Sequence, residues 1–562
     1  MSGTAPGRER RVPGVELQAA LLAAAAPALV GLVAFGLART VLLPGQGFWD
    51  TGEFQVVPPV LGTAHPTGYP SFVILGWLAT LVLAPAGEAA LRMNLLAAIL
   101  FAVAAGLTVV LVRQLTGRSG VAIGAGLLLA LTPIPWRMGG FADPHTLHLA
   151  LTAGLLVLLV GWEERLRAGS PRADRWLVAS AALYGVMLGN HTLTVLLAPG
   201  IALFVLAVEP RILARPRLVA LCAGTLLGTT AALYLELPIR AAMGAPLVYG
   251  HPDTWDGFWY IVLARQFLGD LVNPLGDLGR KIGEFVEITG AELGILAAAV
   301  PAAFLLTAVR RPRFALLTAT WLAVTCWFAA AYTTAAIDRY YLGPLLVMVA
   351  WLGIASGLLV DTLAGATARD GTTGAPSAGG PADAPGAGDA PWQDGGARLV
   401  GGALAAVLAT ALVLPGALAA PATASRIDVS RDTRAGDWSR WALETVGADA
   451  VVVSWWSFST PLWYRTVVLG ERPDVSVVDD RDLLDEGLAS VDDVIRSNVG
   501  SRPVYLVRQP ADMSALEAAW ILEIVPDPYG IQPLYRVVGP RPGAGRAISS
   551  ATAQAPPATM QP

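Results

Sequence analysis

The sequence predicts a polytopic α-helical membrane protein with about eleven to twelve transmembrane segments, followed by a small soluble α/β domain. Hydrophobic residues make up 54% of the 562-residue chain and charged residues only 14%, whereas a soluble domain carries roughly 25% charged residues. Apolar runs such as 17–38 are long enough to cross a hydrocarbon core of roughly 30 Å. Beyond residue 425, short valine-rich runs alternate with helical patterns, which is typical of an α/β domain.

The apolar runs are predicted to be helices, because each backbone amide in lipid must find its hydrogen-bond partner within its own segment. Strands would have to close into a barrel, and these runs are too long and too little alternating for that. The run at 71–86 is short and ends near Pro85, so a re-entrant segment remains an alternative to a full crossing. The predicted segments are 17–38, 71–86, 93–112, 119–135, 147–163, 176–190, 192–208, 218–237, 293–309, 314–334, 340–361 and 399–420.

Arginine clusters set the expected orientation, because short cytoplasmic loops are enriched in Lys and Arg. Placing these clusters in the cytoplasm leaves the loops at 136–146, 238–290 and 335–339 on the outer side of a plasma membrane. The first apolar run is too long for a signal-peptide core, so it is expected to remain as a span. The clusters are Arg8/Arg10/Arg11, Arg113/Arg118, Arg165/Arg167/Arg172/Arg175, Arg211/Arg215/Arg217 and Arg310/Arg311/Arg313.

Composition also predicts the domain boundaries. The stretch 362–398 is rich in Gly, Ala, Pro, Asp and Thr and reads as a disordered linker. Short β-rich runs at 451–453, 475–478 and 504–507 alternate with helical stretches at 437–446 and 513–522. The predicted parts are a cytoplasmic tail (1–16), the main transmembrane domain (17–361), the linker (362–398), the last transmembrane helix (399–420), an extracytoplasmic α/β domain (425–540) and a disordered tail (541–562).

Two classes of site are disfavoured by the residue content. The net charge is −4 and no basic tract is present, so nothing indicates a nucleic-acid partner. The two cysteines, Cys222 and Cys326, both lie in apolar runs, which indicates neither a disulfide framework nor a metal site.

A short polar stretch after the first apolar run carries the clearest functional signal. Asp50 and Glu53 are followed by His65 and Tyr69 in what is expected to be a loop at the membrane edge. Ionisable residues at that depth are costly and usually face a cavity that serves a function. An ordinary solvated loop is the alternative.

The five histidines of the chain all precede residue 252 and all fall in or near outward-facing loops. This distribution favours a site on that side, although polar residues gather in loops for other reasons too. His145 and His148 are three residues apart and share a helix face, just after Asp143, which could simply cap that helix. Two histidines without a clear third ligand are a weak metal signal, so hydrogen bonding to a polar substrate is preferred, and a need for divalent metal is left open. The histidines are His65, His145, His148, His191 and His251.

Three arginines lie on the outer side, against the usual cytoplasmic bias. They are Arg240, Arg265 and Arg339, the last followed by Tyr340. A guanidinium group is a planar fork suited to phosphate, so a lipid-linked phosphate would explain them. Snorkelling toward lipid headgroups is the alternative for each. Aromatic residues in 249–260 and at Trp455 and Trp456 could stack on a sugar, form an interfacial belt or pack in a core.

These motifs together resemble the DUF2723 family, which includes multi-pass protein O-mannosyltransferases and belongs with the GT-C glycosyltransferases. The resemblance covers nearly the whole chain, although Asp143-Pro144-His145 replaces an acidic, aliphatic, aromatic triplet of the family. The segments that carry it are Asp50-Thr51-Gly52-Glu53, His65-Pro66-Thr67-Gly68-Tyr69-Pro70, Gly189-Asn190-His191-Thr192, Leu235-Glu236-Leu237-Pro238-Ile239-Arg240, Gly250-His251-Pro252-Asp253-Thr254-Trp255, Asp338-Arg339-Tyr340-Tyr341 and Glu471-Arg472-Pro473-Asp474-Val475.

The resemblance implies a GT-C-like fold and an enzyme that transfers a sugar, expected to be mannose, from a polyprenyl-phosphate donor to an extracytoplasmic protein or glycan. It implies Asp50 as the base that takes the acceptor proton, with Glu53 as its helper. The soluble domain would guide the acceptor, and no further cofactor is implied. The residues expected to bind substrate or donor are His65, Tyr69, Asp143, His145, His148, His191, Arg240, His251, Arg265, Arg339 and Tyr340.

Two other functions fit parts of the pattern. A transporter or flippase of polyprenyl-linked sugars would share the lipid phosphate and the buried charges, but it would be expected to show internal repeats or paired broken helices, and no clear repeat is seen. A scaffold anchored by its spans would not need a dozen of them.

Overall fold

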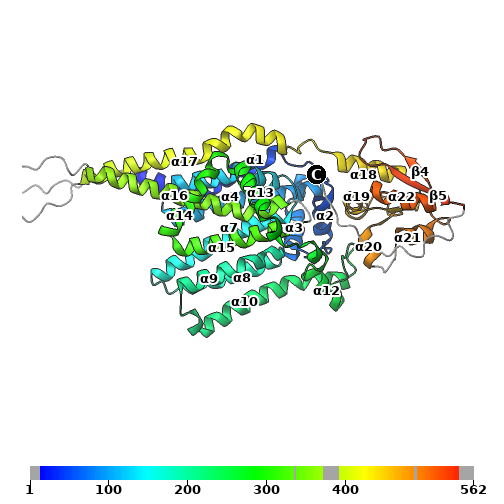
Figure 1. The fold of residues 1–562 in the computed structure, drawn as a ribbon, viewed down its shortest axis with the longest axis horizontal. Helices are drawn as coiled ribbons and strands as arrows, with labels where there is room; N and C mark the ends of the chain where they lie inside the picture. The colour runs from blue at the N-terminus through cyan, green and yellow to red at the C-terminus, as the bar shows by residue number, and fades with distance from the viewer. Residues whose placement is uncertain (1–12, 334–336, 371–390, 486–489, 543–562) are drawn as a thin grey trace, which may run out of the picture.

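The protein forms a long helical bundle with a small α/β domain at one end (Figure 1). The computed structural model describes residues 13–333, 337–370, 391–485 and 490–542. Most of the predicted N-terminal tail, the middle of the predicted linker at 371–390 and nearly all of the predicted C-terminal tail lie outside these residues. The predicted disordered linker 362–398 is too long at both ends, because α16 continues to Asp370 and α17 begins at Pro391.

The bundle is built from helices and single helical turns in the chain order that follows. The α-helices are α1 (Pro13–Thr40), α2 (Trp49–Val60), α3 (Pro70–Val82), α4 (Ala89–Thr116), α5 (Ser119–Leu131), α6 (Pro133–Met138), α7 (Pro144–Arg167), α8 (Ala173–Leu188), α9 (Ala198–Val208), α10 (Pro216–Tyr234), α11 (Glu236–Ala242), α12 (Trp255–Val262), α13 (Leu278–Leu293), α14 (Val300–Arg310), α15 (Pro312–Ala331), α16 (Leu342–Asp370) and α17 (Pro391–Ile427). The 3₁₀ turns are η1 (Ala84–Ala86), η2 (Thr192–Leu197), η3 (Ile212–Ala214), η4 (Arg265–Asp270), η5 (Pro274–Asp277), η6 (Gly294–Ala299) and η7 (Ile337–Tyr341).

The predicted membrane architecture is confirmed. Within the described part of the chain, seven helical segments are long and apolar enough to cross a membrane, and four shorter apolar helices accompany them. The long segments are Ala89–Thr116, Pro144–Arg167, Pro216–Ala242, Pro274–Arg310, Pro312–Ala331, Ile337–Ala364 and Val400–Ile427, and the shorter ones are Ala24–Thr40, Pro70–Val82, Ser119–Leu131 and Thr192–Val208.

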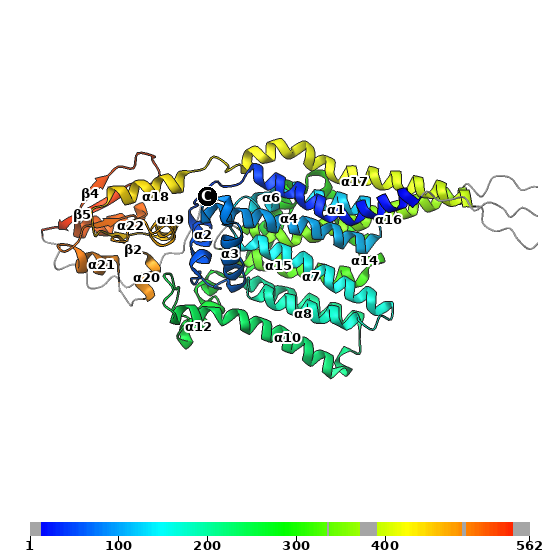
Figure 2. The same ribbon diagram turned by 180° about the vertical axis from the view of Figure 1, so that it is seen from behind.

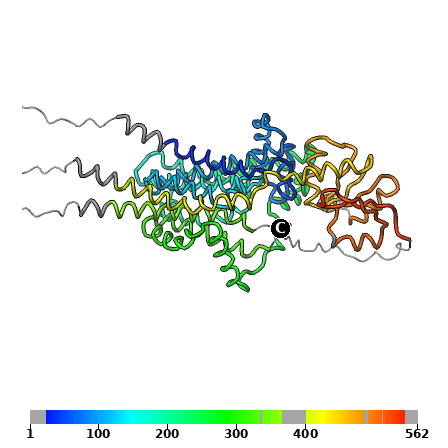
Figure 3. Tube along the Cα trace, turned by 90° about the horizontal axis from the view of Figure 1, so that it is seen from above, coloured from blue at the N-terminus to red at the C-terminus, as the bar shows by residue number. Residues whose placement is uncertain are grey.

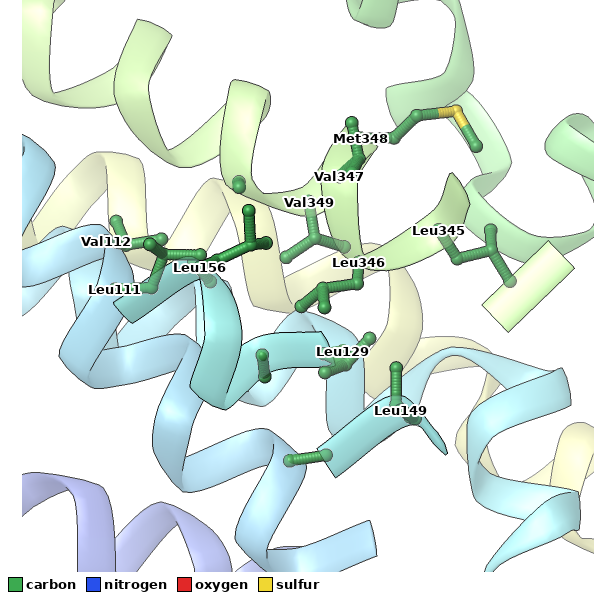
Figure 4. Close-up of a cluster of buried hydrophobic side chains, with 14 of the residues drawn as sticks. Leu111, Val112, Leu129, Leu149, Leu156, Leu345, Leu346, Val347, Met348 and Val349 are labelled. Atoms are coloured by element: carbon green, nitrogen blue, oxygen red, sulfur yellow. The ribbon is translucent and has the colours of Figure 1, made fainter. Parts of the chain in front are cut away.

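The centre of the bundle is packed from small and branched apolar side chains. Figure 4 shows Leu111 of α4, Leu129 of α5, Leu156 of α7 and Leu346 of α16 converging on one another. A Cβ atom on Gly106 of α4 would lie 2.7 Å from a backbone oxygen of α1. Small residues of this kind let transmembrane helices approach closely, and the close packing then holds them together in lipid.

Two expectations about the end of the bundle that carries α2 are wrong. The stretch around Asp50 is the first turn of α2 rather than a loop, because Phe48 adopts an extended conformation as the N-cap and the acidic residue then meets the positive end of the helix. The predicted connecting loop 238–290 is too long, because residues 274–290 belong to the long apolar segment Pro274–Arg310, in which α13 presents Phe285 and Ile288 to the core at helical spacing.

The short helices α2 and α3 stand across the direction of the long helices in both views (Figures 1 and 2). The 13 residues of α3 rise about 20 Å at 1.5 Å per residue, which falls short of a hydrocarbon core of roughly 30 Å. This geometry fits the re-entrant alternative for 71–86. Together α2 and α3 lie between the long helices of the bundle and the C-terminal domain.

The C-terminal domain is an α/β sandwich around one five-stranded sheet with the order β2-β1-β3-β5-β4. Strands β1, β2 and β3 are parallel, whereas β5 pairs antiparallel with both β3 and β4. The three predicted strands and the helix at 437–446 are confirmed, but the helix predicted for 513–522 ends at Ala519 and gives way to β4. The elements are α18 (Arg434–Thr445), β1 (Val451–Val453), α19 (Trp456–Trp463), the π-helical turn η8 (Tyr464–Val468), β2 (Ser476–Val478), α20 (Asp480–Asp485), α21 (Val491–Asn498), β3 (Val504–Leu506), α22 (Pro510–Ala519), β4 (Trp520–Val525) and β5 (Leu534–Pro540).

The domain is docked onto the α2 end of the bundle (Figure 3). A Cβ atom on Gly52 of α2 would lie 2.4 Å from the hydroxyl oxygen of Thr460 in α19, so glycine permits this close approach. The hydroxyl of Tyr464 accepts the backbone N–H of Ala90 at 2.9 Å. The two parts therefore meet through specific contacts at the end where α2 lies.

Candidate functional site

The two carboxylates of α2 are held in place by a buried amide network behind the helix. Asn94 of α4 is fully buried, and its Oδ1 accepts the backbone N–H of Ala142 at 2.9 Å and the Nε2 of Gln55 at 2.8 Å. Its Nδ2 donates to the carbonyl of Leu43 at 2.9 Å. A fully satisfied buried network of this kind rigidifies its surroundings, and here it fixes both the entry to α2 and the entry to α7.

Asp50 has both carboxylate oxygens engaged. Its Oδ2 accepts the Nη1 of Arg339 at 3.0 Å, and its Oδ1 accepts the indole N–H of Trp456 at 3.1 Å. Burial raises the pKa of Asp50, but the Arg339 guanidinium, His65 and the indole N–H outweigh burial and lower the pKa to about 2. Asp50 is therefore an anion bound to a cation.

Arg339 connects three elements at this point. Its Nη1 also reaches Oδ2 of Asp143 at 3.4 Å, while Oδ1 of Asp143 accepts both the backbone N–H and the ring Nδ1 of His145 at 2.7 Å each. Asp143 thus caps α7, as expected, and also joins the charged cluster. Burial opposes ionisation of Asp143, but His145 and Arg339 lower its pKa. Next to Arg339 in the chain, Asp338 pairs with Arg137 of α6, which anchors η7.

Glu53 forms a second cluster one turn further along α2. Its Oε1 accepts the backbone N–H of His65 at 2.8 Å, its Oε2 pairs with the Nδ1 of His65, and Arg481 approaches within 3.3 Å. The hydroxyl of Tyr69 lies 3.1 Å from the Nε2 of His65. Burial opposes protonation of His65, but the Glu53 carboxylate outweighs it and raises the pKa of His65.

Three histidines gather beside this charged row. The ring of His191 lies 4.8 Å from that of His145 and 6.3 Å from that of His148, and Tyr340 lies 5.6 Å from His145. The Nδ1 of His191 accepts the backbone N–H of Leu193, and burial lowers the pKa of His191 well below its usual range. His191 is therefore neutral, with its proton on Nε2 and available to donate.

An open cleft begins at Arg339 and Tyr340 and runs between η2, α15 and α16. Its polar end carries the Nε2 of His145 and the Nδ1 of His148, buried atoms with no hydrogen-bond partner among the described residues. The rest of its wall is mainly apolar, formed by Leu193, Leu197, Trp321, Leu322, Leu342, Pro344 and Val347. The cleft therefore has the polarity of an amphiphile, with a cationic head and an apolar tail.

A second open cleft lies beside Glu53, between α2, the loop at 247–249 and the C-terminal domain. Glu53, Thr63, Arg481 and Asp482 supply its polar groups, and Tyr249 and Trp463 supply aromatic surface. The row Arg339, Asp50, His65, Glu53 and Arg481 thus connects two openings of different polarity.

Most of the residues proposed from sequence are brought together here, and three are placed elsewhere. Arg240 donates to the backbone carbonyls of Val60 and Leu61 and so caps the C-terminus of α2. Arg265 pairs with Asp256 on the exposed face of η4, and the exposed ring of His251 lies 3.9 Å from Asp253. The residues brought together are Asp50, Glu53, His65, Tyr69, Asp143, His145, His148, His191, Arg339 and Tyr340.

Sequence reasoning considered Trp456 only as a surface for stacking or packing, and it missed both the contact of Trp456 with Asp50 and the presence of Arg481. Arg481 stacks at 3.4 Å over the ring of Trp456 and also pairs with Asp479 at 3.0 Å. The signal that could have found them is positional, because Trp456 follows β1 and Arg481 follows β2 at the carboxyl ends of adjacent parallel strands. Within the described segments, no group of three His, Cys, Asp or Glu side chains is arranged to hold a metal ion.

Residues 50–212 match the family model described as the N-terminal domain of the protein O-mannosyl-transferase TMEM260. The mouse (Mus musculus) protein O-mannosyl-transferase TMEM260 is 34% identical to this chain over 176 residues, which cover 31% of this chain and 23% of the mouse protein. The chain thus matches about a quarter of the length of that curated relative. The matched region includes α2 and the three-histidine cluster.

The fold is similar to that of ArnT from Cupriavidus metallidurans. The apo structure of ArnT has a TM-score of 0.58 and 14% identity, and the match covers 92% of this chain and 98% of ArnT. The structure of ArnT bound to undecaprenyl phosphate has a TM-score of 0.56 and 15% identity, with coverage of 91% and 97%. The likeness establishes the GT-C-like fold that the sequence resemblance implied.

Proposed function

We propose that the chain is a GT-C-type membrane glycosyltransferase, of the kind described by the DUF2723 resemblance, that transfers a sugar from a polyprenyl-phosphate donor to a hydroxyl group of an extracytoplasmic acceptor. The observation that carries the proposal is the position of Arg339, which heads the apolar cleft and also binds Asp50. Transfer from a lipid phosphate requires a cation between an apolar cleft and a carboxylate, and Arg339 lies at such a position. The matches to protein O-mannosyl-transferase TMEM260 and to ArnT bound to undecaprenyl phosphate support the same reaction class.

The polar end of the first cleft would receive the donor phosphate. Arg339 offers a planar set of N–H groups suited to phosphate oxygens, and neutral His191 lies beside it with an Nε2–H to donate. The isoprenoid chain would lie along the apolar wall between α15 and α16. The sugar would then project toward Asp50.

Asp50 would act as the base. It takes the proton of the acceptor hydroxyl as the oxygen bonds to the anomeric carbon, and the bond from that carbon to the phosphate oxygen breaks. The polyprenyl phosphate leaves with the electron pair of that bond, and Arg339 stabilises its growing negative charge. The products are the glycoside, the free lipid phosphate and protonated Asp50.

Donor binding would also make Asp50 a stronger base. With its pKa held at about 2, Asp50 is a weak base while Arg339 binds it. A donor phosphate competes for the same guanidinium, and the pKa of Asp50 rises as that contact is shared. The carboxylate therefore becomes a competent base only when the lipid phosphate is present.

The acceptor would approach through the second cleft, past Glu53, Tyr249 and the C-terminal domain. We take mannose as the transferred sugar and a protein as the acceptor, in line with the similarity to protein O-mannosyl-transferase TMEM260. The arginine clusters at the other end of the bundle favour a cytoplasmic location for that end. The site and the C-terminal domain then face outward from a plasma membrane.

The test is transfer of label from radiolabelled polyprenyl-phosphate mannose to candidate acceptors by the full chain in lipid nanodiscs. We expect Asp50→Asn to lower the transfer rate by about 10²–10⁴-fold, as loss of a general base does, with donor binding retained. Asp361→Asn is the matched control, since Asp361 also pairs with an arginine, Arg118. It lies roughly 28 Å along α16 from Leu342, the first residue of that helix. Movement of the intact labelled lipid across vesicles without any transfer would favour a transporter and overturn the proposal.

A further inference from the structure

Two side chains of the C-terminal domain reach the carboxylates of α2 directly. The indole N–H of Trp456 donates to Oδ1 of Asp50 at 3.1 Å, and Nη1 of Arg481 lies 3.3 Å from Oε1 of Glu53. These contacts join residues more than 400 positions apart in the chain. They connect the sheet of the soluble domain to the centre of the site.

The two contacts are coupled to each other. The Arg481 guanidinium lies 3.4 Å from the centroid of the Trp456 ring and 4.8 Å from that of Trp463. Its Nε is fixed by Asp479 at 3.0 Å, so the plane of the guanidinium is held against the indole from behind. A shift of either side chain therefore displaces the other.

Each contact also stabilises or orients the carboxylate that it reaches. Glu53 is 1% exposed, and a buried charge is costly unless it is paired and hydrogen-bonded. Among the described residues, Arg481 and His65 supply the charged partners of Glu53. Asp50 has Arg339 on Oδ2, so the Trp456 N–H on Oδ1 fixes the rotation of the carboxylate about its own axis.

We propose that Trp456 and Arg481 are positioning residues for the transfer reaction, so that the C-terminal domain supplies part of the active site rather than only guiding the acceptor. Trp456 orients Asp50 for proton transfer, and Arg481 holds Glu53 and, through it, His65. This inference rests on the proposed function. Neither residue needs to touch a substrate for it to hold.

The same domain contains a matched control pair. Trp520 donates its indole N–H to Asp492 at 2.6 Å, and Arg496 lies over the Trp520 ring at 5.4 Å while also pairing with Asp492. As at the site, an arginine lies over a tryptophan that donates to an aspartate, but here Asp492 binds both partners and all three residues belong to the C-terminal domain itself. Loss of an indole–carboxylate bond can therefore be compared at the two places.

The first experiment measures transfer by the full chain in nanodiscs for Trp456→Phe and Arg481→Gln, with Trp520→Phe and Arg496→Gln as controls. A hydrogen bond to a charged group corresponds to about tenfold or more in rate, so we expect kcat to fall about tenfold or more in the first pair and to stay within about twofold in the second. Trp456→Phe should also raise the pH at which the acid limb of kcat appears, because removing the N–H raises the pKa of Asp50. Unchanged kcat and an unchanged pH profile in Trp456→Phe would overturn the inference.

The second experiment separates this inference from the proposed function. Melting temperatures of Glu53→Gln, Arg481→Gln and the double variant form a cycle that needs no activity. We expect the double variant to melt at a higher temperature than the sum of the single shifts predicts, and Arg481→Lys to melt closer to wild type than Arg481→Gln. Additive shifts would overturn the inference even if transfer is observed. Coupled shifts in a protein that transfers no sugar would overturn the proposed function, and with it the positioning role, while leaving the contact between Arg481 and Glu53 established.

Discussion

Replacement of Arg339 by glutamine tests the central ion cluster most directly. Asp50 is 25% exposed at its side chain and pairs with Arg339 at 3.0 Å, and its pKa is about 2 instead of the ordinary 3.8. A difference of that size corresponds to about 2 kcal/mol in favour of the ionised carboxylate. Burial acts in the opposite direction, and the Arg339 guanidinium is the largest group that overcomes it.

Without the guanidinium, the burial of Asp50 is no longer offset, so the pKa of Asp50 should rise above 3.8. A carboxyl group whose folded pKa is lowered contributes stability above its unfolded pKa and loses it as the pH falls. In the wild-type protein this loss is confined to the range below about pH 4. In Arg339→Gln the acid limb of the transfer rate should move upward into the measurable range above about pH 4.

The rate should fall as well, because Arg339 also faces the departing phosphate in the proposed reaction. Loss of one group that stabilises developing charge typically lowers kcat by about 10²–10³-fold. The assay is the pH dependence of mannose transfer by Arg339→Gln and Arg339→Lys, with Arg118→Gln as the control at the Asp361 pair. We expect Arg339→Lys to keep the acid limb near that of wild type while losing rate. A glutamine variant with wild-type rate and a wild-type acid limb would refute the role of this arginine.

Two further predictions concern α2 and its neighbours. His65→Gln should lower stability more at about pH 6 than at about pH 9. The folded pKa of His65 is raised, so its charged form contributes stability that is full below the unfolded pKa and is lost as the pH rises through the folded pKa. A difference in melting temperature between variant and wild type that does not change with pH would contradict this. Gly52→Ala should lower the melting temperature and slow transfer, with a cost of about 1–3 kcal/mol typical of overpacking, since the added Cβ would lie 2.4 Å from Thr460. Gly36→Ala, which adds a Cβ with nothing within 4 Å, is the control and should leave both quantities unchanged.

The sequence predicted the membrane spans well because an apolar run of sufficient length has few other stable forms. It also singled out Arg339, since an arginine predicted to lie on the outer side needs a special reason, and in the structure Arg339 contacts Asp50. The same signal proposed Arg240, whose guanidinium instead caps α2 through the carbonyls of Val60 and Leu61. An exposed phosphate and a helix C-terminus attract a guanidinium equally, so sequence position could not separate the two cases.

Other parts could not be predicted because they depend on contacts between distant segments. Trp456 and Arg481 reach α2 across separations of 406 and 428 residues, and no local pattern encodes that pairing. The helix α13 was missed for a different reason. Its charged face resembles a loop by composition, and its apolar face, with Phe285 and Ile288, becomes visible only against the bundle.

The docking of the C-terminal domain follows from the topology of its sheet. In the order β2-β1-β3, the chain adds β2 on one side of β1 and then β3 on the other side, so the strand order reverses between the parallel strands β1 and β3. Open α/β sheets bind their ligands outside the carboxyl ends of the strands, near such a reversal. In this protein the residues that follow β1 and β2, Trp456 and Arg481, contact Asp50 and Glu53 of the membrane domain. The carboxyl ends of the strands, where a free domain would bind a ligand, are therefore in contact with α2. The second cleft, beside the carboxylate of Glu53, is accordingly lined by residues of α2, of the loop at 247–249 and of the C-terminal domain.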